Sequence, residues 1–238
     1  MLIPTMLWIN RLAILEIVLP QAMEARFSND YIESLQDGLH LGLCGSGGPM
    51  PSSTRSGPCV VAIAGNKSFI FDAGTNGARN FGLMGLNYSS IEAVFITHFH
   101  SDHIDGLGEL SLFRWIGGQK REPLNVYGPE GIDQVVNGFN VAYELDSRYR
   151  NLHHGDDVAD LNGYGMIPIT LDMDEKIAST IVFNDDGVKV EAFSVNHAPA
   201  SPAVGYKISY KGRSTVISGD TSKNKNLERN SKDVDLLI

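Results

Sequence analysis

The stretch Phe95–Leu110, FITHFHSDHIDGLGEL, follows an apolar run and places three histidines and two aspartates within nine residues that begin at His98. Alternate residues of an extended backbone project to the same side, so His98 and His100 can reach one ion. Asp102 and His103 come next and can turn toward a second ion. Imidazole nitrogen and carboxylate oxygen suit Zn²⁺, Mn²⁺ or Fe²⁺. Because the chain has seven histidines in all, this density indicates a metal site rather than a solvated loop.

Two residues far along the chain fit the same site. His197 ends the alternating run GVKVEAFSVNH, and Asp220 follows the apolar run of VISGD. Strand ends deliver side chains to a common edge in α/β architectures. Each residue alone is a weak candidate, since a strand-end histidine is often structural and Gly-Asp is a frequent turn. Together they supply ligands that the first cluster lacks.

Short apolar runs broken by glycine and proline begin at Leu39 and alternate with helical patterns. Tight hairpins are expected at residues 65–66 and 211–212, and helices after His103 and over about residues 132–145. Residues 146–186 are polar and aperiodic, which predicts a long loop bordering the active site. His153 and His154 in it are either solvated or contacts at the rim. The whole pattern predicts an α/β domain with packed sheets covered by helices.

Charge and cysteine content restrict the protein class. The formal net charge is -9 over 238 residues, which argues against a surface built to bind nucleic acid, although a local basic patch stays open. Cys44 and Cys59 are too few for a disulfide framework. Two buried free thiols are the favoured interpretation, and a bridge between neighbouring strands is the alternative.

Residues 1–38 form an N-terminal extension whose nature the sequence leaves open. Arg11 precedes the apolar stretch Leu12–Leu19, as in a signal peptide. Glu16 within that stretch and the lack of a clean cleavage site fit a short anchor or a packed or disordered extension instead. A signal peptide would make the protein periplasmic or secreted, and otherwise it would be cytoplasmic. No later stretch approaches the ~18 apolar residues of a membrane span.

The segment THFHSDHIDG matches the T-H-x-H-x-D-H-x-x-G signature of the metallo-β-lactamase fold hydrolases. With GSGGPMP, IFDAG, VYGPEG, VNHAPASPAVGYKI and ISGDT, the chain resembles the branch that contains the tRNA 3′-processing ribonucleases and the arylsulfatase-like enzymes. The resemblance runs from about Leu39 to the C-terminus. It implies that residues 39–238 form an αββα sandwich with a dinuclear metal site, usually zinc, at one edge.

The resemblance also implies a role for each ligand. His98, His100 and His197 would hold one ion. Asp102 and His103 would hold the other ion. Asp220 would bridge the two ions. Asp72 of IFDAG resembles the aspartate that supports the motif from behind, unless it only closes a turn.

The C-terminal end departs from the family pattern. Related sequences supply a further histidine to the second ion from this part of the fold, and no histidine follows His197 here. An apolar strand at the end would also leave a sheet edge unpaired. We therefore expect the 238 residues to be a fragment of a longer protein.

The implied chemistry is hydrolysis by a metal-bridging hydroxide, with Asp102 orienting it or helping with its proton. Many tRNA-processing relatives carry an RNA-gripping arm between the GY and GDT strands, where this chain has a tight hairpin at Lys211–Gly212. That difference favours small ester substrates, such as sulfate esters or phosphodiesters. The alternatives are a tRNA 3′-end processing endoribonuclease, a β-lactamase, or a non-catalytic binding domain of the same fold. Dimers are common among the relatives, so a homodimer is open.

Overall fold

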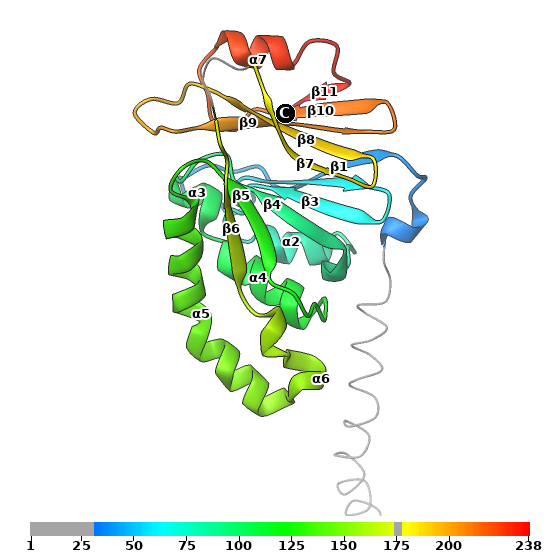
Figure 1. Ribbon diagram of the computed structural model, residues 1–238, viewed down its shortest axis with the longest axis vertical. Coiled ribbons are helices and arrows are strands. Elements are labelled where there is room, and N and C mark those ends of the chain that lie inside the picture. The colour runs from blue at the N-terminus through cyan, green and yellow to red at the C-terminus, as the bar shows by residue number, and fades with distance from the viewer. Residues whose placement is uncertain (1–30, 174–177) are drawn as a thin grey trace, which may run out of the picture.

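The computed structural model describes residues 31–173 and 178–238. The N-terminal segment on which the signal-peptide hypothesis rests, residues 1–30, lies outside the described residues. Two β-sheets pack face to face, with helices on the outer face of each, as the αββα prediction requires (Figure 1). In the described part of the chain, no helix is both long and apolar enough to cross a membrane.

The first sheet has six strands in the order β1 to β6, which is also their order in the chain. The first three strands pair antiparallel, and β3 to β6 pair parallel. The parallel part needs helical crossovers, which the intervening helices supply. The strands are β1 (Leu39–Gly45), β2 (Cys59–Ala64), β3 (Lys67–Phe71), β4 (Ile91–Phe95), β5 (Leu124–Gly128) and β6 (Met166–Thr170).

The second sheet has five strands in the order β11-β10-β9-β8-β7. All its pairs are antiparallel except the β10–β11 edge. Lys211 and Gly212 have φ of 48° and 77°, as a two-residue hairpin turn of type I′ requires, so the expected hairpin is confirmed. The strands are β7 (Thr180–Asp185), β8 (Val188–Ser194), β9 (Val204–Tyr210), β10 (Arg213–Ile217) and β11 (Leu236–Leu237).

Most helices cover the first sheet, and α7 covers the second (Figure 1). The described helices are α2 (Gly77–Leu83), α3 (Ser101–Ile104), α4 (Leu107–Ile116), α5 (Ile132–His154), α6 (Asp156–Ala159) and α7 (Lys225–Asn230), and the short 3₁₀ turns are η1 (Tyr31–Ser34), η2 (Tyr88–Ser90) and η3 (Leu161–Gly163).

The prediction of a long irregular loop over residues 146–186 is wrong. Helix α5 continues to His154, and α6, β6 and β7 follow within that range. Ion pairs one turn apart, Glu144 with Arg148 and Asp146 with Arg150, support the helix where its sequence becomes polar. Strand β6 forms because it pairs with β5. The local sequence pattern does not predict this pairing.

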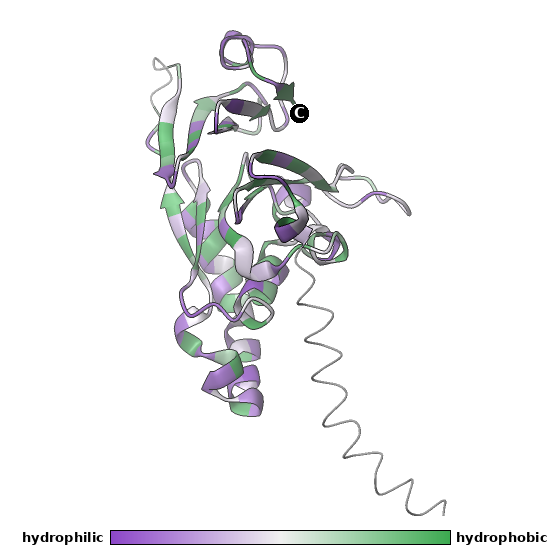
Figure 2. Cartoon of the chain, turned by 90° about the vertical axis from the view of Figure 1, so that its right-hand side faces the viewer, coloured by the Kyte–Doolittle hydropathy of each residue, from purple (hydrophilic) through white to green (hydrophobic). Residues whose placement is uncertain are grey.

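The space between the sheets is filled mainly by aromatic and β-branched side chains. Phe71 and Phe95 stack with ring centroids 5.1 Å apart, and Tyr206 packs on both from the second sheet. A second cluster lies between the first sheet and its helices. Strand β2 is therefore buried on both faces, which is why its sequence, CVVAIA, is continuously apolar. Figure 2 shows hydrophobic residues, in green, along strands of both sheets.

The prediction of two free thiols is also wrong, because Cys44 and Cys59 form a disulfide with Cα atoms 5.0 Å apart. They lie on the antiparallel strands β1 and β2, where Gly45 pairs with Cys59 across an irregularity in the register. Strand pairing thus brings the cysteines together across a separation of 15 residues. The disulfide closes the loop that connects β1 to β2.

Candidate metal centre

The histidine motif occupies the connection between β4 and α3, and buried hydrogen bonds fix its backbone. Thr97 donates from its backbone N–H to Asp72 Oδ1 at 2.8 Å and from its hydroxyl to Asp72 Oδ2 at 2.9 Å. The buried Tyr206 hydroxyl donates to the Ile96 carbonyl at 2.7 Å, which ties the motif to the second sheet. The side chains of His98 and His100 therefore leave from a backbone that is held on both sides.

Four of the predicted ligands converge at this edge of the sandwich. One donor atom from each of His98, His100, His197 and Asp220 lies within 4.8 Å of the other three. His98 Nε2 lies 3.0 Å from His100 Nδ1, and His197 Nε2 lies 3.2 Å from the same atom. Tetrahedral zinc with Zn–N bonds of about 2.0–2.1 Å separates its ligand atoms by roughly 3.3 Å. The spacing of these nitrogens thus fits one shared ion.

His197 and Asp220 reach the cluster from the second sheet, from the β8–β9 connection and from the end of β10. A backbone bridge joins the two segments, because Ser222 N–H donates to the Asn196 carbonyl at 2.8 Å. The hydroxyl of Ser222 also bonds to that carbonyl at 3.2 Å. This bridge sets the distance between the two ligands, and sequence reasoning did not identify its residues.

His103 lies beside the cluster and is suited to a second ion. Its Nδ1 makes a 2.7 Å hydrogen bond with Asp72 Oδ2, which orients the ring. Its Nε2 is buried without a hydrogen-bond partner, 3.6 Å from Asp220 Oδ1 and 3.8 Å from Asp102 Oδ2. Because an unsatisfied buried nitrogen costs about 1–3 kcal/mol, a cation shared with these carboxylates would relieve a real penalty. Asp72 thus contacts His103 as the resemblance implies for a supporting aspartate.

Burial and the neighbouring charges act differently on the two buried histidines. Burial, followed by the neighbouring imidazole of His103, lowers the pKa of His98 to about 3. The His98 ring is then neutral at pH 7, which is the form that binds metal. Burial also opposes protonation of His103, but the hydrogen bond to Asp72 and the charges of Asp72, Asp220 and Asp102 outweigh it and raise the pKa of His103.

Glycines allow the ligand-bearing segments to approach closely. A Cβ on Gly74 would lie 2.3 Å from the Asp102 carbonyl oxygen, and one on Gly106 would lie 2.4 Å from the Gly74 oxygen. Gly106 N–H also donates to the Ala73 carbonyl at 2.8 Å. Gly106 is the N-cap residue of α4, so its close contact with Gly74 lets that helix begin near the ligands.

His153 and His154, the other candidates from the sequence, lie away from the site. His153 and His154 end α5, at the opposite end of the helix from the motif, so they are not rim contacts (Figure 1). A helix of 23 residues is about 34 Å long. The six predicted ligands, in contrast, all lie at one edge. Their binding of metal remains a prediction.

Comparisons with known proteins agree with this arrangement. The family model described as "Metallo-beta-lactamase superfamily" matches residues 53–237. The ribonuclease Z of Mycolicibacterium gilvum (strain PYR-GCK) is 30% identical over 193 residues, 80% of this chain and 64% of that protein. The ribonuclease Z of Mycobacterium bovis (strain BCG / Pasteur 1173P2) is 31% identical over 202 residues, 84% of this chain and 69% of that protein.

Among solved structures, the human tRNase Z, short form, has a TM-score of 0.59 and 25% identity to this chain. The superposition covers 83% of this chain and 76% of the human one. The chain spans less than two thirds of the length of the M. gilvum relative. These relatives favour the ribonuclease alternative over the small-ester interpretation that the sequence alone suggested.

Proposed function

Because this chain belongs to the metallo-beta-lactamase superfamily, we propose that this hydrolase cleaves phosphodiester bonds in RNA, at the 3′ ends of tRNA precursors. The observation that carries the proposal is the convergence of His98, His100, His197 and Asp220 in a chain 30–31% identical to ribonuclease Z proteins. The domain that does this chemistry would be residues 39–238, together with any further part of the full-length protein.

Two divalent ions, typically zinc in this fold, would be held by the six predicted ligands. His98, His100 and His197 would bind one ion, Asp102 and His103 the other, and Asp220 would contact both. When bound, such ions lower the pKa of a water and neutralise charge on a phosphoryl oxygen. The unpartnered Nε2 of His103 and the nitrogen spacing around His100 support this assignment.

Asp102 is the residue best suited to proton transfer. Its carboxylate is partly accessible, with 13% of the side chain exposed, and lies 3.8 Å from Nε2 of His103. From there it would accept a hydrogen bond from the attacking water and orient it. Asp72 acts only through other residues, because it holds Thr97 and His103 in position.

A polar groove at the β1–β2 loop supports this proposal despite the net charge of -9. The groove has a volume of about 330 Å³ and is lined by hydroxyl groups and by Arg55. The loop approaches the metal centre at Gly57, because a Cβ placed on this glycine would lie 2.8 Å from the Asp102 carbonyl oxygen. Arginine and hydroxyl groups bind phosphates along a nucleic-acid backbone.

One observation favours a second candidate, the hydrolysis of small phosphate or sulfate esters. The β9–β10 hairpin turns in two residues, Lys211 and Gly212. The family resemblance implies that many tRNA-processing enzymes carry an RNA-gripping arm at this position. A protein without such an arm holds a long substrate less firmly. Small esters require no contact beyond the centre itself.

The experiment is a substrate comparison with the full-length protein, supplied with Zn²⁺ or Mn²⁺. A tRNA precursor with a 3′ trailer, a bis-aryl phosphate and an aryl sulfate are offered in parallel. We expect cleavage of the precursor at the trailer junction, loss of that cleavage in Asp220→Ala, and full activity in Asp157→Ala, which changes an exposed aspartate of α6. Turnover of aryl sulfate without cleavage of the precursor would overturn the proposal.

A further inference from the structure

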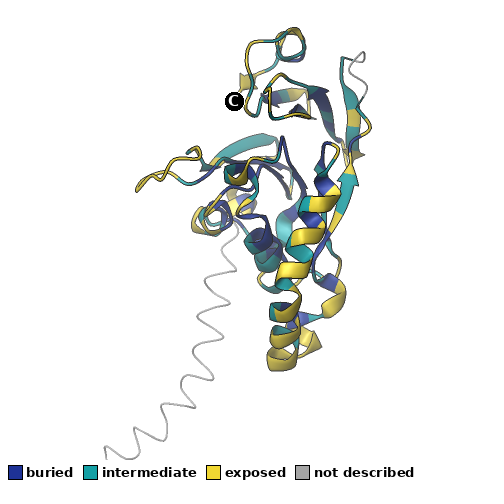
Figure 3. Ribbon diagram, turned by 90° about the vertical axis from the view of Figure 1, so that its left-hand side faces the viewer, coloured by how far each residue is buried: buried dark blue, intermediate teal, exposed yellow. Residues whose placement is uncertain are grey.

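The chain directly after Asp220 carries an exposed group of cations. Residues 221–232 contain four cations and one carboxylate, in a chain whose net charge is -9. All four cationic residues are exposed, on α7 and on the segments that flank it (Figure 3). They are Lys223, Lys225, Arg229 and Lys232, and we call them the α7 cations. A local patch of one sign attracts partners of the opposite sign.

Helix α7 is held on the second sheet by amides, and this leaves its cations facing solvent. Asn226 Nδ2 donates to the carbonyl of the last residue of β8 at 3.2 Å, and Asn230 Nδ2 donates to the Ala178 carbonyl at 3.0 Å. Residues four apart lie on one face of a helix. Lys225 and Arg229 each precede one of these asparagines by one position, so they share a different face, which is exposed.

The same segment is tied to the metal centre at its start. The backbone bridge at Ser222 fixes where the chain leaves the centre. The Asn224 side chain caps α7 by accepting a hydrogen bond from the Leu227 N–H at 2.9 Å. Three residues of extended chain span at most roughly 11 Å, so the Cα atoms of Asp220 and Lys223 are no farther apart than this. An RNA strand that reaches the metal centre therefore has the α7 cations beside it.

Most of these positive charges are not neutralised by described residues. Glu228 pairs with Lys223 at 3.2 Å, and the Lys223 side chain is still 88% exposed. In the described part of the chain, no carboxylate lies within ion-pair distance of the other three α7 cations. Asp235, which follows the segment, pairs with Arg213 at 2.6 Å. Three cations are thus available to an external anion.

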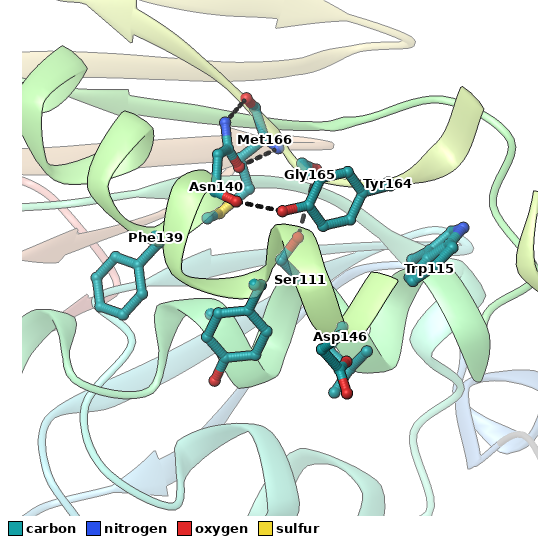
Figure 4. A pocket seen from close by; sticks show the side chains of 11 residues that line it. Ser111, Trp115, Phe139, Asn140, Asp146, Tyr164, Gly165 and Met166 are labelled. Atoms are coloured by element: carbon teal, nitrogen blue, oxygen red, sulfur yellow. Dashed lines mark hydrogen bonds between the residues drawn. The ribbon is translucent and has the colours of Figure 1, made fainter. Parts of the chain in front are cut away.

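The cavity between helices α4 and α5, by contrast, is too small for any part of an RNA strand. It measures about 10 Å³, room for about one water molecule. The Asn140 amide at its side donates to the Met166 carbonyl at 2.9 Å and accepts from the Met166 N–H at 3.0 Å, and the Tyr164 hydroxyl donates to the Asn140 carbonyl (Figure 4). A long substrate would therefore be bound on the surface, as at α7, and not in this cavity.

We propose that the α7 cations bind the sugar–phosphate backbone of the RNA substrate beside the scissile bond. This contact rests on the proposed function, because it requires that RNA enters the metal centre. Lysine and arginine side chains that neutralise phosphates release the counterions bound there, and this contribution does not depend on the base sequence. The contact needs no inserted arm, so the short β9–β10 hairpin is compatible with an RNA substrate.

Cleavage of a tRNA precursor over a series of salt concentrations tests the contact in the full-length protein supplied with Zn²⁺. In Lys225→Gln/Arg229→Gln, we expect kcat/KM to be several-fold lower at low salt. The slope of log kcat/KM against log salt concentration should become less steep by about 0.7–0.9 for each cation removed, since each phosphate contact releases counterions. Damage to the fold alone would lower kcat/KM without changing this slope. Metal content and circular dichroism check that each variant is intact.

The matched control is Arg121→Gln, which removes one cation whose side chain is 65% exposed. Arg121 precedes β5, and β5 runs parallel to β4, so this residue lies at the end of the first sheet opposite the histidine motif. The control should keep the slope of the unmodified protein. Equal slopes in the control and the double variant, with the precursor cleaved, would overturn the α7 contact and leave the proposed function standing. If the unmodified protein did not cleave the precursor, the proposed function would be refuted, and the α7 contact with it.

A further variant changes the charge in the other direction. Glu228→Gln removes the one carboxylate of residues 221–232 and releases Lys223 from its ion pair. At low salt, kcat/KM for the precursor should therefore rise, and its dependence on salt should become steeper. A lower kcat/KM with an unchanged slope would contradict the proposal, because that is the result expected from the loss of a purely structural ion pair.

Discussion

The two sheets contribute to the metal centre in unlike ways. The residues that follow the first sheet, such as His98 and His103, are 1% and 2% exposed and lie in a hydrogen-bonded frame centred on Asp72. His197 and Asp220, which follow strands of the second sheet, have side chains 25% and 49% exposed and depend on the bridge between Asn196 and Ser222. His98 and His103 are thus part of the core, whereas His100, His197 and Asp220 are more accessible to solvent.

This difference teaches that loss of a ligand and loss of its support should have different signatures. A change in the exposed half removes an ion's ligand and leaves few buried groups unpaired. A change in the buried half leaves hydrogen-bond donors without acceptors. It therefore lowers the free energy of unfolding as well as the affinity for metal. Stability and metal content measured on the same variants therefore separate the two halves.

The largest effect is expected for Asp220→Ala. Removal of a carboxylate shared by both ions should reduce metal binding and turnover well beyond the roughly 10–100-fold cost of changes outside the ligand shell. The melting temperature of the metal-free protein should hardly change, because Asp220 is half exposed. Metal analysis and thermal melting check both statements. Substantial turnover with bound metal would remove Asp220 from the ligand set.

Asp72→Ala should produce the opposite signature. Three donors lose their acceptor, namely the Thr97 N–H, the Thr97 hydroxyl and the His103 ring. The metal-free protein should lose about 3 kcal/mol of unfolding free energy, and metal affinity should fall about 10–100-fold. Urea unfolding and metal titration measure these losses. Thr97→Ser keeps both donors and serves as the control, and equal stability of Asp72→Ala and that control would contradict the buried frame.

The disulfide joins two strands of the first sheet. Cys44 and Cys59 close a loop with a separation of 15 residues, so replacing both by serine should cost about 3 kcal/mol of unfolding free energy. Reduction of the unmodified protein, followed by urea unfolding, should give a similar loss. Two reactive thiols in the unreduced, unfolded protein would show that the bridge does not form.

The smallest effect on stability is expected for the ion pairs that connect the two sheets. Lys67 of β3 pairs with Asp185, the last residue of β7, at 2.9 Å and with Asp186 of the β7–β8 turn at 2.7 Å. Its hydrogen bonds to Asp186 and Asp185 raise the pKa of Lys67, and Lys67 lowers the pKa of Asp185. Lys67→Met should lower the melting temperature at pH 7 by a few degrees at most, because exposed ion pairs contribute little.

Lys67→Met and the unmodified protein differ in melting temperature, and the pH dependence of this difference follows from the directions of the pKa shifts. A lowered carboxyl pKa contributes stability above the unfolded pKa of about 3.9, and this is lost as the pH falls through the folded value. The raised pKa of Lys67 keeps the amine charged to beyond its unfolded value of about 10.4. The melting difference between Lys67→Met and the unmodified protein should therefore disappear in strong acid. A difference that persists there would indicate a packing effect of the lysine stem.

Local sequence patterns predicted much of the fold and the positions of the candidate ligands. The hairpin at Lys211–Gly212 and the motif between β4 and α3 depend on residues close in sequence. The disulfide and strand β6 depend on strand pairing, which local patterns do not contain. The second half of α5 was missed because its inner face has few apolar residues, and ion pairs one turn apart support the helix there.

Substrate preference was the least accessible property. The net charge of -9 describes the whole chain, whereas RNA would meet only a local surface such as the loop around Arg55. A ligand set specifies a type of chemistry, and the surrounding surface selects the molecule on which it acts. The comparison with known relatives therefore changed the proposed substrate but not the candidate ligands.

The contact between Gly74 and Gly106 has a consequence for how this sequence tolerates change. Neither residue binds an ion in our proposal, yet the smallest added side chain on either would lie 2.3–2.4 Å from a backbone oxygen. In a library that covers every single substitution, both positions should be depleted of all other amino acids as thoroughly as the histidines. A purely functional selection would then count them among the active-site residues, although their requirement is one of space.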